Sequence, residues 1–148
     1  MSKVEELKKD LVNAMKEKDK EVMATLRGVK GAMQMEIINK KLEESDELLL
    51  DVINKQIKMR NDSILEFSKA GRDDLVSSYK REIEILSKYM PKQLSDEELD
   101  GIIDDVFDEV KPESIKDLGK IMKVITPKVK NRCNMQVLNG KIRSKLEA

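Results

Sequence analysis

The sequence predicts an all-α fold, with an N-terminal helical domain of about four helices and a small C-terminal domain of three. Three observations lead to this prediction. Apolar residues recur every three or four positions along most of the 148 residues, which is the period of a helix face. Residues 1–90 contain no proline, so long helices can run there without interruption. No segment alternates apolar and polar residues between turn signals, so no sheet is expected.

The first domain is predicted over residues 1–91. Its four helix starts are predicted from side chains that can accept hydrogen bonds from the free N–H groups of a first turn. These predicted N-caps are Ser2, Asp19, Ser45 or Asp46, and Asp73. Ser2 forms a capping box with Glu5. The pair Ala70-Gly71 is expected to end the third helix, because glycine readily adopts the left-handed conformation that closes helices.

The second domain is predicted over residues 92–148, after a linker around Pro91. A second capping box, Ser95 with Glu98, opens its first helix, and Lys111-Pro112 ends it. A short helix is expected over about residues 115–126, interrupted at Thr126-Pro127. The last helix presents Val137, Leu138, Ile142 and Leu146 on one side.

Charge is separated within the second domain. Residues 92–113 carry nine acidic side chains and two lysines, a net charge of −7. Residues 114–148 carry nine basic and two acidic side chains, a net charge of +7. The basic residues are Lys116, Lys120, Lys123, Lys128, Lys130, Arg132, Lys141, Arg143 and Lys145. They are the candidate nucleic-acid-binding residues, because clustered Lys and Arg bind phosphate backbones through charge and counterion release.

Two other interpretations of this basic segment remain open: a solvated surface, or an internal partner for the acidic helix. At 100° per residue, Lys116, Lys120 and Lys123 share one side of their helix. No aromatic residue lies in residues 114–148, so bases could not stack on this segment. If RNA binds here, the protein is expected to recognise backbone and shape.

The acidic helix carries Glu97, Asp100, Asp104 and Asp108 along one stripe. Repulsion between carboxylates at this spacing destabilises a helix, so compensation by the basic segment or by a partner protein is expected. A metal site is a weak alternative, because no EF-hand loop and no His or Cys ligand accompanies the stripe. No metal site is predicted.

No catalytic residue and no cofactor is predicted. The chain has no histidine, which removes Ser-His and Cys-His nucleophiles and histidine acid–base chemistry. Its six glycines form neither a P-loop nor a dinucleotide-binding motif. Cys133 is interpreted as a small apolar filler. Gln56 and Arg60 interrupt an apolar stripe, and a buried guanidinium there needs a carboxylate from Glu36, Glu82 or Glu84.

A cytoplasmic location is expected from two features. The chain has one cysteine, so no intrachain disulfide can form. No stretch has the roughly 18 consecutive apolar residues that span a membrane, and the charged N-terminal segment lacks the apolar run of a signal peptide. No membrane partner is predicted, and the oligomeric state is not determined by the sequence.

Several segments resemble the GatB/YqeY family, in the form of a stand-alone YqeY-like protein. The most specific are Tyr89-Met-Pro-Lys-Gln-Leu94 and Asp117-Leu-Gly-Lys-Ile-Met122. The others are Leu26-Arg-Gly-Val-Lys-Gly-Ala32, Lys58-Met-Arg-Asn-Asp-Ser-Ile64 and Ala70-Gly-Arg-Asp-Asp-Leu75. The resemblance implies an all-α fold jointed near Pro91. It also implies kinship between residues 92–148 and the tail domain of the B subunit of tRNA-dependent amidotransferases, which helps to hold tRNA.

One turn departs from the family pattern. The family usually has Gly-[Arg/Lys]-Ala-Asp-Gly after the proline segment, whereas this chain has Asn131-Arg-Cys-Asn-Met135. Asn131 can still adopt the left-handed conformation, and Asn134 can still cap the last helix. Met135 in place of glycine puts a close backbone contact to RNA at this turn in doubt.

Three functional hypotheses follow. The first is a non-catalytic accessory protein that binds tRNA or other RNA through the basic segment. The second is a helical adaptor for a protein partner. The third, implied by the resemblance alone, is a component of a carbon–nitrogen ligase that uses glutamine as amide donor, as in aminoacyl-tRNA amidotransferases.

Overall fold

The computed structural model describes residues 2–147. The described helices are α1 (Lys3–Glu17), α2 (Lys20–Lys40), α3 (Asp46–Lys69), α4 (Asp73–Ser87), α5 (Asp96–Val110), the 3₁₀ helix η1 (Ile115–Asp117), α6 (Leu118–Val129) and α7 (Met135–Glu147). No strand occurs in residues 2–147. The prediction of an all-α fold is confirmed.

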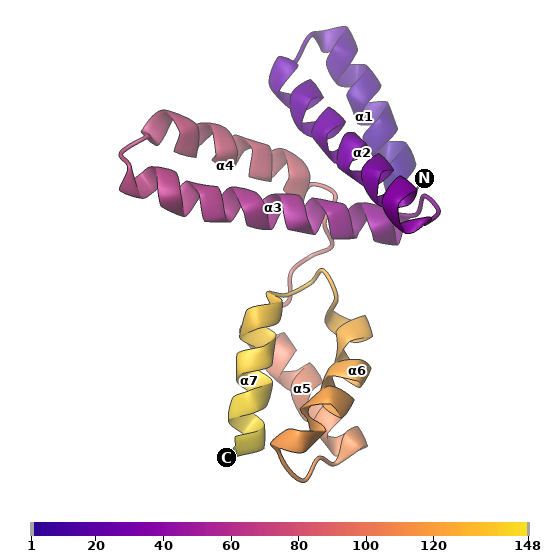
Figure 1. Cartoon of the computed structure of the whole chain (residues 1–148), viewed down its shortest axis with the longest axis vertical. Coiled ribbons are helices and arrows are strands. Elements are labelled where there is room, and N and C mark those ends of the chain that lie inside the picture. The colour runs from indigo at the N-terminus through magenta and orange to yellow at the C-terminus, as the bar shows by residue number, and fades with distance from the viewer. Residues whose placement is uncertain (1, 148) are drawn as a thin grey trace. The chain divides into compact units, whose positions relative to one another are not determined.

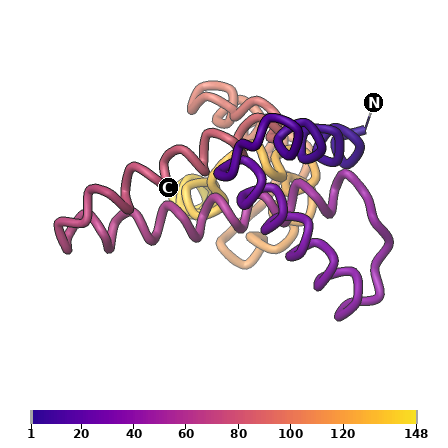
Figure 2. The backbone as a smooth tube through the Cα atoms, turned by 90° about the horizontal axis from the view of Figure 1, so that it is seen from above, coloured from indigo at the N-terminus to yellow at the C-terminus, as the bar shows by residue number. Residues whose placement is uncertain are grey.

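The chain divides into two compact units, Met1–Met90 and Pro91–Ala148, here called the N-terminal and C-terminal units. In the N-terminal unit, α1 pairs with α2 and α3 pairs with α4, and α2 also contacts both α3 and α4 (Figure 1). Figure 2 shows α3 and α4 running side by side to the turn that joins them. In the C-terminal unit, α5, η1, α6 and α7 pack together. Independent folding of the predicted domains 1–91 and 92–148 stays a prediction.

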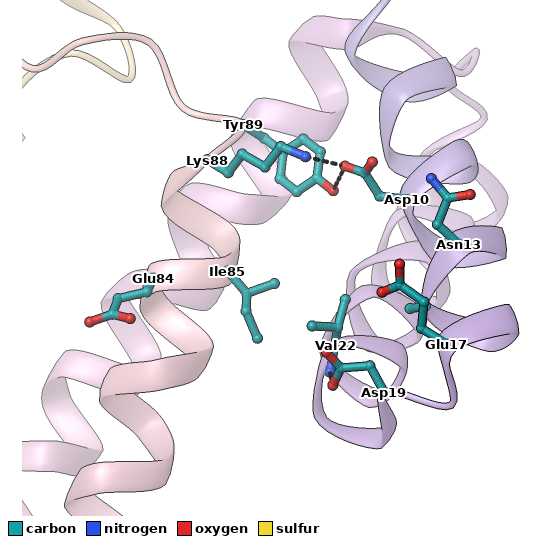
Figure 3. Close-up of a pocket in the computed structure, with 10 residues that line it drawn as sticks. Asp10, Asn13, Glu17, Asp19, Val22, Glu84, Ile85, Lys88 and Tyr89 are labelled. Carbon is teal, nitrogen blue, oxygen red and sulfur yellow. Dashed lines mark hydrogen bonds and ion pairs between the residues drawn. The ribbon is translucent and has the colours of Figure 1, made fainter.

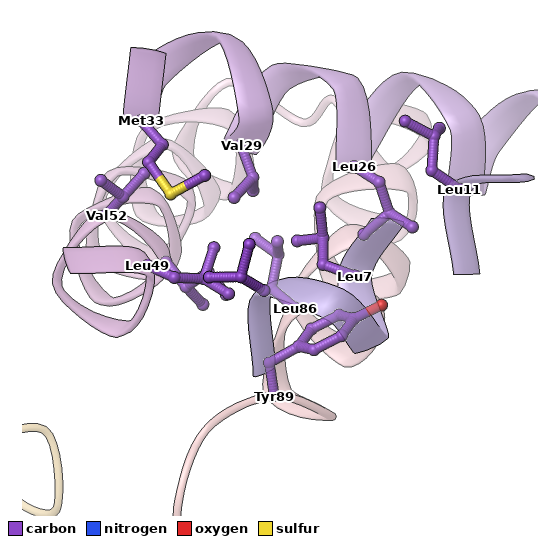
Figure 4. Close-up of a cluster of buried hydrophobic side chains, with 11 residues drawn as sticks. Leu7, Leu11, Leu26, Val29, Met33, Leu49, Val52, Leu86 and Tyr89 are labelled. Carbon is purple, nitrogen blue, oxygen red and sulfur yellow. The ribbon is translucent and has the colours of Figure 1, made fainter. Parts of the chain in front are cut away.

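Each unit has a hydrophobic core of its own. The first is built from α1, α2, α3 and the end of α4, and it includes Leu7, Leu26, Leu49, Leu86 and Tyr89 (Figure 4). The second is built from α5, α6 and α7. Its buried residues are Leu99, Ile103, Val106, Ile121, Ile125, Val129, Leu138 and Ile142. Leucine, isoleucine and valine fill the second core, because the C-terminal unit has a single aromatic residue, the half-buried Phe107.

Most predicted helix starts are confirmed by hydrogen bonds. Ser2 forms the capping box with Glu5, and Asp19 and Ser45 accept hydrogen bonds from the N–H groups of Val22 and Leu48. The alternative third cap, Asp46, has a different role: its carboxylate accepts hydrogen bonds from the N–H groups of Lys3 and Val4, each at 3.0 Å. Asp46 therefore stabilises the start of α1 and holds α3 against it.

The predicted cap at Asp73 is wrong, since the N-cap of α4 is Arg72. Gly71 adopts φ 72°, and the carbonyl of Arg72 directly after it accepts hydrogen bonds from the N–H groups of Leu75 and Val76, each at 3.1 Å, so the helix begins one residue earlier than expected. Asp73 and Asp74 lie in the first turn, where the positive end of the helix dipole favours carboxylates. The Arg72 guanidinium also donates two hydrogen bonds to Asp74, each 3.2 Å long.

The predicted interruption at Thr126-Pro127 is also wrong, because α6 continues through Pro127 to Val129. Pro127 lies in the last turn, where its missing N–H removes one helical hydrogen bond near the end. The turn is held by Lys130 N–H, which donates to the Thr126 carbonyl at 2.9 Å. Burial of Val129 on the same face as Ile125 favours the extra turn.

Candidate nucleic-acid interface

The nine candidate basic residues lie on η1, α6, α7 and the turn between the two α-helices. Buried Ile121 and Ile125 fix the orientation of α6 against the core. The lysines at 116, 120 and 123 are exposed, as their spacing predicted. They form an outward row that follows η1 onto α6, which we call the α6 lysine row.

Three of the nine cations have a partner on the acidic helix, and the two that lie on α7 make the closest contacts. Lys141 Nζ lies 2.8 Å from an Asp100 carboxylate oxygen and 3.8 Å from one of Asp96. The hydrogen bond with Asp100 raises the pKa of Lys141 above its ordinary value, although burial opposes this. Lys145 forms an ion pair with Asp104 and lies over the Phe107 ring, 4.8 Å from its centroid. The α7 cations thus compensate two of the four carboxylates of the predicted stripe, Asp100 and Asp104.

Two further cations have ion-pair partners but remain open to solvent. Lys120 Nζ lies 3.5 Å from Asp117, and its side chain is 76% exposed. Lys128 Nζ lies 4.0 Å from Glu109. Exposed pairs of this kind are weak, because solvent screens them. Lys120 therefore remains able to meet another anion.

Four of the nine cations have no ion pair with another described residue in the structure. Lys116 and Lys123 belong to the α6 lysine row and project into solvent. The Arg132 guanidinium donates to the Lys128 carbonyl at 3.5 Å, and the Arg143 guanidinium donates to Asn139 Oδ1 at 2.7 Å. Both arginine acceptors are neutral, so neither hydrogen bond cancels the guanidinium charge, although Arg132 also interacts electrostatically with the Glu98 carboxylate. The α6 lysine row and the two arginines are thus the cations most able to bind phosphate.

The turn that departs from the family pattern is held by the segment after Pro91. Asn131 adopts φ 64°, as expected, and its carbonyl accepts a hydrogen bond of 3.0 Å from the Gln93 side chain. Leu94 N–H donates to the Arg132 carbonyl at 2.8 Å. Asn134 Oδ1 accepts hydrogen bonds from the first turn of α7, which confirms the predicted cap. Gln93 and Leu94 therefore fix this turn, which positions Arg132.

Cys133 in the same turn is half-buried, and burial raises the pKa of its thiol. The thiol is therefore protonated near neutral pH, where a thiolate would be needed for nucleophilic attack. This environment supports its interpretation as a small apolar filler.

A pocket of about 480 Å³ lies in the N-terminal unit, between α1, the start of α2 and the end of α4 (Figure 3). Its charged lining residues are Asp10, Glu17, Asp19, Glu84 and Lys88. Asp10 is already bound by Lys88 Nζ at 2.8 Å and by the Tyr89 hydroxyl at 2.5 Å. Sequence reasoning missed this cluster, because Asp10 and Tyr89 are 79 positions apart and no local pattern connects them. Since the Asp10 carboxylate is bound by its neighbours, the cluster fastens α4 to α1.

The predicted ion pair of Arg60 is confirmed with one of its three candidate carboxylates. Arg60 Nη2 lies 3.3 Å from a Glu82 oxygen, and Nη1 donates to the Gln56 side chain at 2.7 Å. Glu36 pairs instead with Lys40 and Lys55. Arg60 therefore joins α3 to α4, and Gln56 holds its guanidinium in place.

Within the described residues, no three His, Cys, Asp or Glu side chains are grouped so that they could hold a metal ion. None of the helices in residues 2–147 is both long enough and apolar enough to cross a membrane.

Comparison with known proteins gives a match over almost the whole chain. The model of the Yqey-like protein family matches residues 4–146. Three curated relatives are each named altered inheritance of mitochondria protein 41, mitochondrial. The protein from Kluyveromyces lactis is 39% identical over 71% of this chain and 58% of its own length. The one from Lachancea thermotolerans is 36% identical over 75% of this chain and 61% of its own length. The one from Pyrenophora tritici-repentis is 32% identical over 85% of this chain and 70% of its own length.

The chain thus spans about three fifths of the length of the first two relatives. The prediction of a cytoplasmic location is contradicted by these relatives, which are named as mitochondrial proteins. That prediction rested on a single cysteine and on the lack of a long apolar run. Both features are equally compatible with a mitochondrial compartment, so they could not distinguish the two.

Proposed function

The chain belongs to the YqeY-like protein family, and from this premise we propose that it is a non-catalytic accessory protein that binds tRNA or another structured RNA. The observation that supports the proposal most is the α6 lysine row. Lys116 and Lys123 are exposed and have no ion pair within residues 2–147. Arg132 and Arg143 add two cations whose acceptors are neutral.

The proposed interface binds phosphate rather than bases. Each lysine or arginine that neutralises a phosphate releases condensed counterions, and this release favours binding at low salt. If the three lysines of the row and the two arginines each contact a phosphate, the logarithm of the association constant is expected to fall with the logarithm of the salt concentration with a slope of roughly −4. A structured RNA presents phosphates from two strands at fixed spacing, which suits cations held on a rigid helix.

The test is a titration of bulk tRNA against the full chain at about 50 mM and about 200 mM salt. We expect affinity to fall by roughly a hundredfold or more over this range. The double variant Lys116→Glu/Lys123→Glu should weaken binding at the lower salt by at least about tenfold, because it reverses two of the five charges of the proposed interface.

The matched control is Lys58→Glu/Lys69→Glu, which makes the same charge change on exposed positions of α3. If both double variants lose affinity equally, binding is a nonspecific response to net charge. If the Lys116→Glu/Lys123→Glu variant binds tRNA as the unaltered chain does, the proposed interface is wrong. Thermal melts of both variants report whether the fold is preserved.

The alternative, a component of a glutamine-dependent carbon–nitrogen ligase, comes from the family resemblance alone. It requires that the full chain changes the rate of glutamine-dependent amidation of charged tRNA when kinase-like and glutaminase subunits are supplied. An RNA-binding accessory protein would bind tRNA without changing that rate. Measuring both tRNA binding and the amidation rate therefore distinguishes the two proposals.

A further inference from the structure

Helix α2 has two apolar faces on opposite sides. The inner face, with Leu26, Val29 and Met33, is buried in the core of the N-terminal unit. The outer face carries Ala24, Gly28, Gly31, Met35 and Ile38, which we call the outer stripe. All five outer residues are exposed, with Met35 at 57% and Ile38 at 69%. Apolar residues on both sides are typical of a helix with neighbours on both sides.

The spacing of the outer stripe suits another helix. Its members follow one another at intervals of 4, 3, 4 and 3 residues. This 3.5-residue average is the period at which one helix packs side chains into the holes of a second. A single exposed apolar residue needs no explanation, whereas a continuous stripe at this period indicates a docking surface.

The two glycines at positions 28 and 31 leave the helix backbone open. Apart from the adjacent residues and the backbone of the helix itself, no atom lies within 4 Å of a Cβ built at either position, and neither residue has a positive φ. Glycine inside a helix costs roughly 1 kcal/mol relative to alanine. The conformation does not require glycine here, and on the outer stripe these two positions leave room for the close approach of a partner backbone.

One edge of the outer stripe is cationic. Lys20, Arg27 and Lys30 are exposed on the same side of it, and none of the three has an ion pair with another described residue. On the opposite edge, Glu21 is already bound by Arg81 at 3.0 Å. The stripe therefore lacks carboxylates next to its cations, and a complementary partner would supply them.

We propose that the outer stripe of α2 binds an amphipathic helix of a partner protein whose edge carries Asp or Glu. A second copy of this chain fits less well. In an antiparallel pair Lys20 and Arg27 would face the same cations of the other copy, and in a parallel pair they would face an edge whose carboxylate is already bound to Arg81. A lipid surface would gain little from Gly28 and Gly31, because burial of glycine in acyl chains supplies almost no apolar area.

The test uses a designed, fluorescently labelled helical peptide with Leu along its contact face and Glu along both edges. A second peptide carries Lys in place of Glu. We expect the full chain to bind the Glu peptide at least about tenfold more tightly than the Lys peptide, a difference of about 1.4 kcal/mol. The variant Gly31→Leu should weaken binding of the Glu peptide by about tenfold or more, because its side chain occupies the space of the partner backbone.

Gly31→Leu is a clean probe, because open space surrounds the added side chain and the helix propensity of leucine exceeds that of glycine. Its melting temperature should therefore equal or exceed that of the unaltered chain. The matched control is Gly101→Leu on α5, another exposed helical glycine with no atom within 4 Å of a built Cβ. The control should bind the Glu peptide as the unaltered chain does.

Any of four outcomes overturns the proposal. Gly31→Leu could bind the Glu peptide undiminished, or the two peptides could bind equally. Light scattering could show a dimer that Gly31→Leu dissociates, which would assign the stripe to a second copy. Vesicles containing phosphatidylserine could capture the chain and lose it with Gly31→Leu, which would assign the stripe to a membrane surface.

Discussion

At the residue scale, the Asp10–Tyr89 contact shows how one buried hydroxyl can fix the end of a helix. Tyr89 is 1% exposed, and burial together with the nearby Asp10 carboxylate raises the pKa of its phenol. Burial also acts to raise the pKa of Asp10, but the hydrogen bonds from Lys88 and Tyr89 lower it below the ordinary value of 3.8. The pair is therefore a neutral donor bound to a charged acceptor, which is the stronger kind of hydrogen bond.

Removing this hydrogen bond should destabilise the protein. Tyr89→Phe keeps the buried ring but leaves Asp10 without its phenol donor, so we expect a loss of about 1.5 to 3 kcal/mol in the free energy of unfolding. Urea unfolding at neutral pH measures the loss. The control is Tyr79→Phe, whose half-buried ring stacks on Phe67 with centroids 5.7 Å apart. Equal losses in the two variants would contradict the assigned role of Asp10.

The loss of stability in Tyr89→Phe is also expected to depend on pH. Because the pKa of Asp10 is lower in the folded protein, its contribution to stability is present above its unfolded pKa, the ordinary value of 3.8, and disappears as pH falls through the folded value. The stability difference between the unaltered chain and Tyr89→Phe should therefore narrow in acid. A difference that stays constant from neutral pH to below the folded pKa would show that the charge of Asp10 does not matter.

At the scale of the helices, charge explains how α7 is placed against α5. The carboxylates of Asp96, Asp100 and Asp104 lie one turn apart on α5, and Lys141 and Lys145 meet them from α7. Repulsion within the acidic stripe is thereby relieved at Asp100 and Asp104. The apolar contacts of Leu138 and Ile142 set the distance between the helices, and the ion pairs favour this register of α7.

Reversing one of these charges should weaken the α5–α7 contact. In Lys141→Glu a third carboxylate would face Asp96 and Asp100, so we expect a lower melting temperature at low salt and a smaller difference at high salt, where repulsion is screened. The control is Arg143→Glu, which makes the same charge change on α7 at a residue bound to neutral Asn139. A loss that is equal for both variants, or independent of salt, would refute the ion-pair explanation.

At the scale of the whole molecule, the two cores have no residue in common. Every buried residue of the first core lies at or before Tyr89, and every buried residue of the second lies at or after Leu99. The outer stripe of α2 and the α6 lysine row belong to different units. The proposed protein partner and the proposed RNA would therefore bind surfaces supported by separate cores.

Separate cores predict that fragments 1–91 and 92–148 each fold alone. Each fragment keeps its buried side chains together, so its circular dichroism and amide NMR spectra should reproduce its part of the full-chain spectra. The second fragment should melt at a lower temperature, because a domain of about 60 residues buries only about 60% of the surface of its unfolded chain. A disordered first fragment would show that its core depends on residues after 91.

The sequence by itself determined the helices, most of their ends and the separation of charge. A cap such as Ser2, Ser95 or Asn134 bonds to N–H groups within three residues of it, so local sequence contains the whole interaction. For the same reason the exposure of the α6 lysine row followed from helical spacing alone. Local sequence predicted the wrong helix end at Pro127, because the burial of Val129 outweighs the hydrogen bond lost with the missing proline N–H.

Tertiary structure alone decided which of several possible partners each side chain has. No local pattern predicts these contacts, because Asp10 and Tyr89 are 79 residues apart and Asp100 and Lys141 are 41 residues apart. The same holds for α2, where the sequence contains both apolar faces but only packing shows that the outer one is uncovered. Which cations remain for RNA also depends on packing, because α7 brings Lys141 and Lys145 to the carboxylates of α5.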